Sequence, residues 1–199
     1  MQQVRETQKK ETRLRLIEAA RVEFDTVGYS NATLRAIAKR ADVSTGAIFA
    51  SFKNKEELLA EVQIITLRKI GDTMHATVIE DEPLISAILK RTKAAVDFEI
   101  KDISNSLSRI AASYSWSMDY EKRYLKAIQH PLEAARAPFE QAVAAGELPA
   151  KAPIDTAVEL LFTLYLRTLR RARLYKETSD EIVERMRPSI ELIVAGLKA

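Results

Sequence analysis

The side chains between Thr33 and Lys55 suit hydrogen bonding to a polar partner better than covalent chemistry. Arg35 carries a guanidinium, which can donate two parallel hydrogen bonds to a pair of acceptors such as those on the edge of guanine. Small residues follow it, whose hydroxyl and methyl groups can contact base edges weakly: Ser44, Thr45, Ala47, Ala50 and Ser51. Four basic residues nearby are candidates for phosphate contacts, or else ordinary solvated charges: Lys9, Lys10, Arg13 and Lys55.

Residues for catalysis are scarce. The chain has no cysteine and only two histidines, His75 and His130, which lie far apart in the sequence. Neither a glycine-rich phosphate loop nor a nucleophile elbow occurs. His75 with Asp72 could form a metal pair, but two ligands fall short of a site, and a histidine on a helix surface is the favoured interpretation. We therefore predict no catalytic residue, no cofactor and no metal.

The positive charge lies at the N-terminal end of the chain. Residues 1–55 contain 11 Lys and Arg against 6 Asp and Glu, whereas residues 56–199 contain 20 against 22, within a formal net charge of +3. We call these two parts the head and the body and predict that they are separate domains. A basic head suits contact with a polyanion, although a solvated basic face would look the same.

No segment reads as a membrane span or a leader. The longest stretch without a charged residue runs only from Val43 to Phe52, far short of the roughly 18 to 20 residues that cross a bilayer. The first residues, MQQVRETQKK, lack the apolar segment of a signal peptide. We expect a cytoplasmic protein without a membrane partner.

The head reads as three helices. The first spans about residues 10–27, with Leu14, Ile17, Ala20 and Phe24 on one stripe, and Gly28 ends it. The second runs from its N-cap Thr33 to about Ala41, and the third begins after Ser44, with Phe49 and Phe52 as anchors. Such a pair of short helices joined by a turn is typical of a helix-turn-helix, whose second helix fits the major groove of DNA.

The body also reads as helix throughout. The whole chain has only five glycines and six prolines, and no alternating pattern long enough for a strand. Asn54 and Glu57 resemble a capping box that starts the next helix, and later helices are predicted at 84–101, 104–117, 119–145, 154–175 and 179–198. The predicted fold is all-α, with about nine helices in a three-helix head and a larger body.

The last helix carries one continuous apolar seam. Its members recur at intervals of three and four residues, as in a coiled coil: Val183, Met186, Ile190, Ile193 and Leu197. Leu161 and Leu164 lie on the preceding helix. These seven residues could form a four-helix dimer interface, or both seams could face their own core. Pro188 should bend the final helix without ending it.

A family resemblance covers about the first 60 residues. The run TLRAIAKRADVSTGAIFASFKNKEELL, residues 33–59, resembles the helix-turn-helix of the tetracycline-repressor (TetR) family, and FDTVGYSNATL before it resembles the family's entry to that motif. The matching features include Ala38, Val43, Gly46, the aromatic Phe49 and the FKNKE segment. Many positions at fixed spacing make the resemblance specific.

The resemblance implies a homodimer that binds a palindromic DNA operator, with a cavity for a small-molecule inducer in each body. It places DNA contacts at Thr33, Arg35, Ser44, Thr45, Ala47, Phe49, Ala50, Ser51 and Lys55. Phe49 stands where the family most often has tyrosine, so one phosphate hydrogen bond is lost. Ala50 and Ser51 replace larger residues, which leaves the operator sequence open.

Aromatic residues of the body are the candidates for the ligand cavity. They are Tyr114, Trp116, Tyr120, Phe162 and Tyr165. Aromatic rings with polar tips suit a mostly apolar pocket, but ordinary core packing is the favoured interpretation of any single one. A repressor released by an inducer is the expected function. The rival interpretations are a helical interaction module without DNA binding and a helical enzyme.

Overall fold

The structure is a computed structural model that describes residues 2–77, 82–103, 106–107, 110–111, 114 and 116–198. Every regular element in these ranges is helical, which confirms the all-α prediction. The elements are α1 (Gln2–Val27), α2 (Leu34–Arg40), α3 (Thr45–Ser51), α4 (Lys55–His75), α5 (Leu84–Glu99), the 3₁₀ helix η1 (Ile100–Asp102), α7 (Met118–Ala144), α8 (Ile154–Tyr175) and α9 (Ser179–Lys198). The helix predicted at 104–117 falls mostly outside the described residues. No described helix combines the length and apolar character needed to cross a membrane.

The chain divides into two compact units. The N-terminal unit contains residues 1–66 and 104–126, and the C-terminal unit contains residues 67–103 and 127–199. The helices α4 and α7 each contribute to both units.

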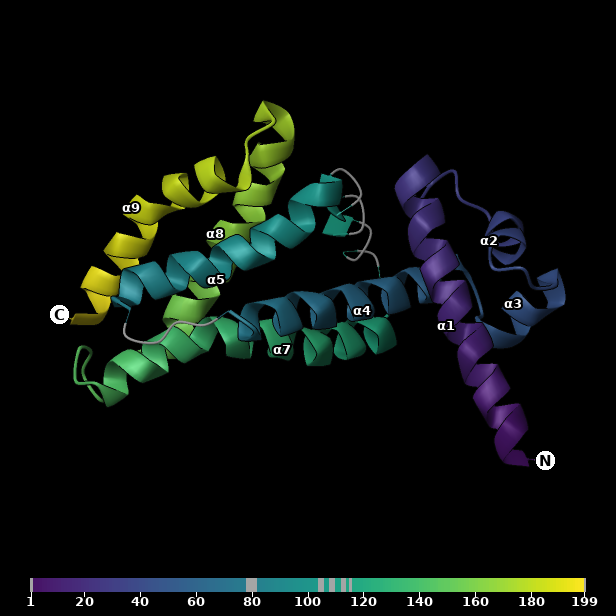
Figure 1. Cartoon of the computed structure of the whole chain (residues 1–199), viewed down its shortest axis with the longest axis horizontal. Coiled ribbons are helices and arrows are strands. Elements are labelled where there is room, and N and C mark those ends of the chain that lie inside the picture. Colours follow the sequence, from purple (N-terminus) through teal and green to yellow (C-terminus); the bar gives the residue numbers. More distant parts are fainter. Residues whose placement is uncertain are drawn as a thin grey trace. The chain divides into compact units, whose positions relative to one another are not determined.

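The N-terminal unit is built on α1, with α2 and α3 beside it (Figure 1). Ile17, Ala20 and Phe24 are buried as predicted, and Gly28 ends the helix with a φ of 81°. Leu14 is an error in the predicted stripe: it is 60% exposed, and Leu16 is buried in its place. The helix also begins earlier than predicted, at Gln2, because its polar first turns are rich in good helix formers and need no packing partner.

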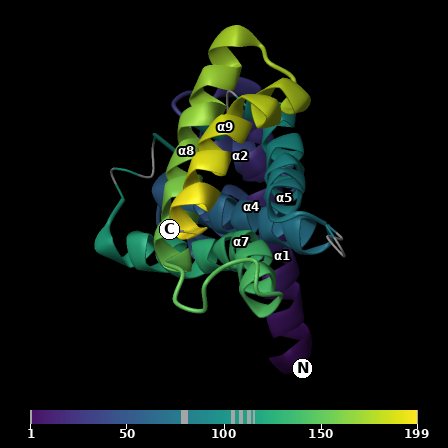
Figure 2. The ribbon, with the colours of Figure 1, turned by 90° about the vertical axis from the view of Figure 1, so that its left-hand side faces the viewer.

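In the C-terminal unit α9 lies against α5 and α8 (Figures 1 and 2). Val183, Met186 and Ile190 of α9 are buried in one core cluster with Phe139 and Ile88. The same cluster contains Leu161 and Leu197, and Leu164 and Ile193 pack against it half-buried. The predicted interface seam therefore packs inside its own subunit, the alternative left open by the sequence. A heptad-like seam needs an apolar partner, and α5 supplies one within the chain. The helix α9 continues past Pro188, as predicted.

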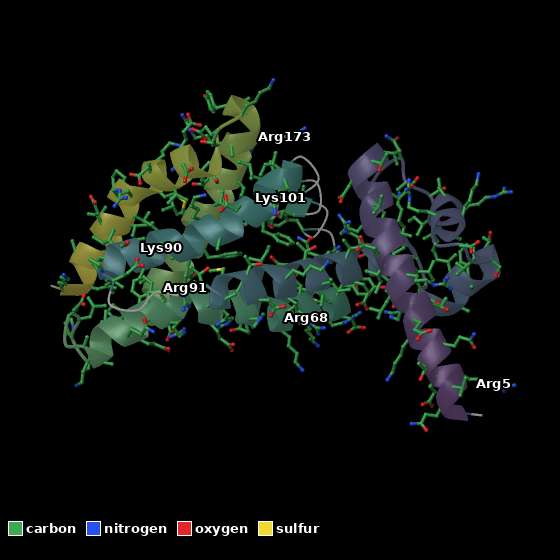
Figure 3. All side chains as sticks on the ribbon, viewed as in Figure 1. Arg5, Arg68, Lys90, Arg91, Lys101 and Arg173 are labelled. Atoms are coloured by element: carbon green, nitrogen blue, oxygen red, sulfur yellow. The ribbon has the colours of Figure 1, made fainter. Side chains whose placement is uncertain are left out.

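A buried arginine repairs a gap in the backbone bonding of α7. Pro138 lies inside α7 and has no N–H, so the carbonyl of Ala134, four residues before it, lacks its helical donor. The Nη1 of Arg91 on α5 donates to this carbonyl oxygen at 2.5 Å, and Figure 3 marks Arg91 on its helix. Burial lowers the pKa of the Arg91 guanidinium. The pair joins α5 to α7 through a charge-assisted bond.

Candidate nucleic-acid interface

Two hydroxyl caps and one tight turn shape the helix pair α2 and α3. The Oγ1 of Thr33 accepts a hydrogen bond from the N–H of Ala36 at 3.1 Å, and the Oγ of Ser44 accepts one from Ala47 at 3.2 Å. Between the helices Asp42 adopts a φ of 52°, a left-handed conformation that aspartate tolerates better than most residues. The N–H of Val43 then donates to the carbonyl of Ala38 at 3.0 Å. The predicted caps of both helices are confirmed.

The inner faces of these helices hold the motif together. Ile37 and Ala38 of α2 are buried with Ile48 of α3 and with Phe52 just after it. Phe49 was predicted as a second anchor, but this is wrong, because its side chain is 59% exposed. Ile48, one position earlier, faces the core instead. Phe49 thus projects from the outer surface of the motif.

The outer face forms an open depression over the turn. Its lining comes from Arg35, Lys39, Asp42, Val43, Ser44 and Thr45. Arg35 and Lys39 lie one helical turn apart and are both exposed. Within the described part of the chain neither side chain forms an ion pair. Three of the nine predicted DNA contacts therefore share one surface, and Lys39, which the sequence interpretation passed over, lies with them.

The remaining positions of α3 differ in exposure. Ala50 is exposed, whereas Ala47 and Ser51 are half-buried. The hydroxyl of Ser51 donates to the carbonyl of Ala47 at 2.9 Å, so it is already used within the helix. The exposed surface of α3 is made mainly of Thr45, Gly46, Phe49 and Ala50.

Arg13 has a different role from the one predicted. Its Nη1 donates to the carbonyl of Ser51 at 2.5 Å, and its Nη2 lies 2.6 Å from the carboxylate of Glu61. The guanidinium also lies 4.2 Å from the centre of the Phe52 ring. Arg13 therefore caps the C-terminal end of α3 and joins α1 to α4. Its guanidinium already donates hydrogen bonds within the protein, so we do not assign it a phosphate contact.

Lys55 is likewise bound to the protein backbone. Its ammonium donates to the carbonyl oxygens of Tyr29 and Ala32 at 2.7 and 3.0 Å and lies 4.5 Å from the centre of the Tyr29 ring. Burial lowers the pKa of this ammonium. At the same helix start, Asn54 Oδ1 accepts from the N–H of Glu57 at 2.7 Å, so the predicted cap is confirmed. Lys55 joins the start of α4 to the connection between α1 and α2.

Exposed basic side chains also line the first turns of α1. Arg5, marked in Figure 3, is exposed, as are the predicted phosphate candidates Lys9 and Lys10. Because these side chains are exposed, a polyanion could reach them.

The five candidates for a ligand cavity fall into both units. Trp116 and Tyr120 belong to the N-terminal unit, where Trp116 packs half-buried against the core of the helix-turn-helix and contacts Tyr124 edge to face at 5.6 Å. Tyr114, of the same unit, is 84% exposed. Phe162 and Tyr165 lie on α8 in the C-terminal unit.

Tyr165 is the most informative of the five. Its hydroxyl oxygen is buried and has no hydrogen-bond partner among the described residues. Burial, with a smaller effect of the Glu99 charge, raises the pKa of this hydroxyl well above its usual value. A buried polar group without a partner costs free energy, so it marks a place where a ligand could supply the missing bond.

Comparison with known proteins gives a consistent picture. Residues 16–62 match the family profile described as bacterial regulatory proteins, tetR family. The regulator BetI of Burkholderia thailandensis is 28% identical over 120 residues, which cover 59% of this chain and 60% of that protein. The repressor AcnR of Corynebacterium jeikeium is 34% identical over 94 residues, 47% of each chain. The matched region thus spans about half the length of these curated relatives.

The fold similarity extends over nearly the whole chain. The regulator FadR of Bacillus subtilis, solved in complex with stearoyl-CoA, superposes with a TM-score of 0.73 over 92% of this chain and 98% of that one, at 18% sequence identity. At this identity the similarity concerns the fold alone. The family profile covers α2 and α3 together with the parts of α1 and α4 that hold them.

Proposed function

We propose that this chain is a member of the tetR family, whose profile matches its residues 16–62, and that it is a repressor that binds a palindromic operator as a homodimer and leaves it when a small molecule binds. The observation that carries the proposal is the depression on the outer face of α2 and α3. It brings the exposed cations of Arg35 and Lys39 beside the hydroxyls of Ser44 and Thr45. A surface of this kind offers bonds to phosphates and to base edges at once.

The contacts divide into two kinds. We assign sequence reading to Arg35 and to the exposed residues Thr45, Phe49 and Ala50 of α3, because these can reach base edges. We assign phosphate binding to Lys39 and to the exposed lysines of α1. Lys55 and Arg13 hold the motif in shape through backbone carbonyls.

The dimer surface that we propose is the exposed side of α8 and α9. Leu192 is 75% exposed, and Leu160 of α8 is exposed as well. Ala195 and Gly196 follow Leu192 by three and four residues and are also exposed, so two α9 helices could approach closely on this side. This surface replaces the predicted seam, which packs inside the subunit.

The inducer is proposed to bind in the C-terminal unit, near Tyr165. The support is the buried hydroxyl of Tyr165, which lacks a hydrogen-bond partner among the described residues. Stearoyl-CoA is the first compound to test, because a regulator of the same fold was solved with it bound.

The test is a selection from randomised duplex DNA, followed by fluorescence anisotropy at two salt concentrations. Recovery of an inverted repeat with steeply salt-dependent binding is expected, because neutralised phosphates release counterions. Arg35→Ala should reduce the preference for the selected sequence by about 1–3 kcal/mol. Arg68→Ala, which removes an exposed arginine of α4 in the C-terminal unit, is the matched control and should leave binding unchanged. Failure to enrich any sequence, or equal losses for both variants, would contradict the proposal.

A further inference from the structure

The only two histidines of the chain lie side by side in the C-terminal unit. His75 is the last residue of α4, and His130 lies on α7. They are 55 positions apart in the sequence, yet their ring centres are only 4.9 Å apart. The sequence paired His75 with Asp72 alone, which is too few ligands for a metal. The fold supplies the missing ones.

Each helix contributes one imidazole and one carboxylate, spaced by three residues. On α7 His130 is followed by Glu133, and on α4 Asp72 precedes His75. This spacing places both groups on the same face of a helix. Ligand atoms of His75, His130 and Glu133 all lie within 4.8 Å of one another. The carboxylate Oδ1 of Asp72 lies 2.8 Å from Nε2 of His130.

From this arrangement we infer a binding site for a divalent transition-metal ion, with His75, His130 and Glu133 as ligands. Two imidazoles with one carboxylate are a donor set that zinc accepts, with a fourth position left for water. In the tautomer in which Nε2 of His130 donates to the Asp72 carboxylate, Nδ1 is the ring nitrogen left for the metal. Metal-binding histidines commonly have such a carboxylate partner.

The geometry requires only a small adjustment. Two ligands about 2.0–2.1 Å from a tetrahedral zinc lie about 3.3 Å apart, so the side chains must close by about 1.5 Å at most. His75 and Glu133 are exposed, and rotation of their side chains can achieve this. The ion would hold the last turn of α4 against α7.

Gly71 allows the His130 ring to lie close to α4, where it can bind the metal ion together with His75. A Cβ at this position would lie 2.3 Å from Cδ2 and 2.9 Å from Cγ of the His130 ring. No side chain can therefore occupy position 71 unless the imidazole moves away from α4. The glycine provides a variant that displaces a ligand without removing one.

The experiment is a titration of the full chain, without a histidine tag and freed of metal by a chelator, with Zn²⁺ in competition with a chromophoric indicator. Saturable binding of one Zn²⁺ per chain is expected, with a rise in melting temperature because the ion binds only the folded state. Replacement of a residue that hydrogen-bonds to a metal ligand typically lowers metal affinity by about 10–100-fold, so we expect this loss for Asp72→Asn and at least as much for His75→Ala and His130→Ala. Glu133→Gln should also weaken binding. Glu140→Gln, two turns further along α7 and also exposed, is the matched control and should bind as the native chain does.

Gly71→Ala separates a lost site from a lost fold. Alanine favours the helix more than glycine does, so the melting temperature without metal should not fall, while Zn²⁺ affinity should drop by about tenfold or more. The inference would be overturned by absence of saturable binding in the native chain, by native affinity in His75→Ala or His130→Ala, or by equal weakening in Glu140→Gln. None of these results depends on whether the protein binds DNA.

Discussion

The bond between Arg91 and the carbonyl of Ala134 can be tested by a pair of substitutions. Arg91→Met keeps an unbranched apolar stem of similar length but removes the guanidinium that donates to this carbonyl at 2.5 Å. The second substitution, Pro138→Ala, restores a backbone N–H at the position that would bond to the same oxygen in a regular helix. If the arginine compensates for the proline, its removal should matter less once the proline is gone.

The expected magnitudes follow from the surroundings. A hydrogen bond from a charged donor contributes about 1.5–3 kcal/mol, and a buried carbonyl left without a donor costs about 1–3 kcal/mol. Removal of a buried cation offsets part of this loss, since burial lowers the pKa of the Arg91 guanidinium. We therefore expect Arg91→Met to lower the free energy of unfolding by about 1–2 kcal/mol, and by about 1 kcal/mol less in the Pro138→Ala background.

Urea unfolding followed by circular dichroism, at one fixed protein concentration, measures all four members of this cycle. Lys101→Met, which removes an exposed cation of η1 in the same unit, is the control and should change stability little. An equal cost of Arg91→Met in both backgrounds would refute the reasoning, because the arginine and the proline would then act independently.

Three further predictions concern single side chains. Tyr165→Phe should leave stability unchanged or raise it near neutral pH, because the lost hydroxyl is buried without a partner among the described residues. Because burial raises the pKa of this hydroxyl, the folded protein keeps a proton that the unfolded chain loses above about pH 10. The free energy of unfolding of the native protein should therefore fall as the pH rises above this value. The same fall in a Tyr165→Phe protein would contradict this explanation. Lys55→Met should lower the melting temperature as well as DNA affinity, since the Lys55 ammonium donates to the carbonyls of Tyr29 and Ala32. A loss of DNA affinity with an unchanged melting temperature would instead indicate that Lys55 only binds phosphate. Leu192→Glu should yield a monomer in light-scattering measurements, whereas Leu14→Glu, at an exposed leucine of α1, should keep the native assembly; a dimer in both variants would place the interface elsewhere.

The helical architecture was accessible from the sequence because its signals are local. Capping residues such as Thr33 and Ser44, the glycine after α1 and the three-and-four spacing of apolar residues each act within a turn or two of the chain. The same holds for the exposed face of α2, where Arg35 and Lys39 share a helical side. The spacing of those two residues could have identified Lys39 as well.

Prediction and structure differ where the same residue pattern is compatible with two different packing partners. An apolar seam shows that α9 packs against something, but the pattern is the same whether the partner is α5 of the same chain or a second subunit. Arg13 and Lys55 are ordinary surface cations by sequence, and only the fold brings backbone carbonyls 38 and 26 residues away within reach of them. Phe49 and Ile48 are adjacent, and a helix rotates by about 100° per residue, so a shift of one position exchanges anchor and surface.

The sequence by itself determined that the chain is helical, where most helices begin and end, and that its first 60 residues form a helix-turn-helix. These properties rest on interactions between residues a few positions apart. Only the tertiary structure decided which cations are committed to carbonyls and which remain exposed on α2, and only it brought His75 and His130 together. These contacts depend on the packing of helices that are distant in the sequence, and no local residue pattern encodes which of their side chains lie close together.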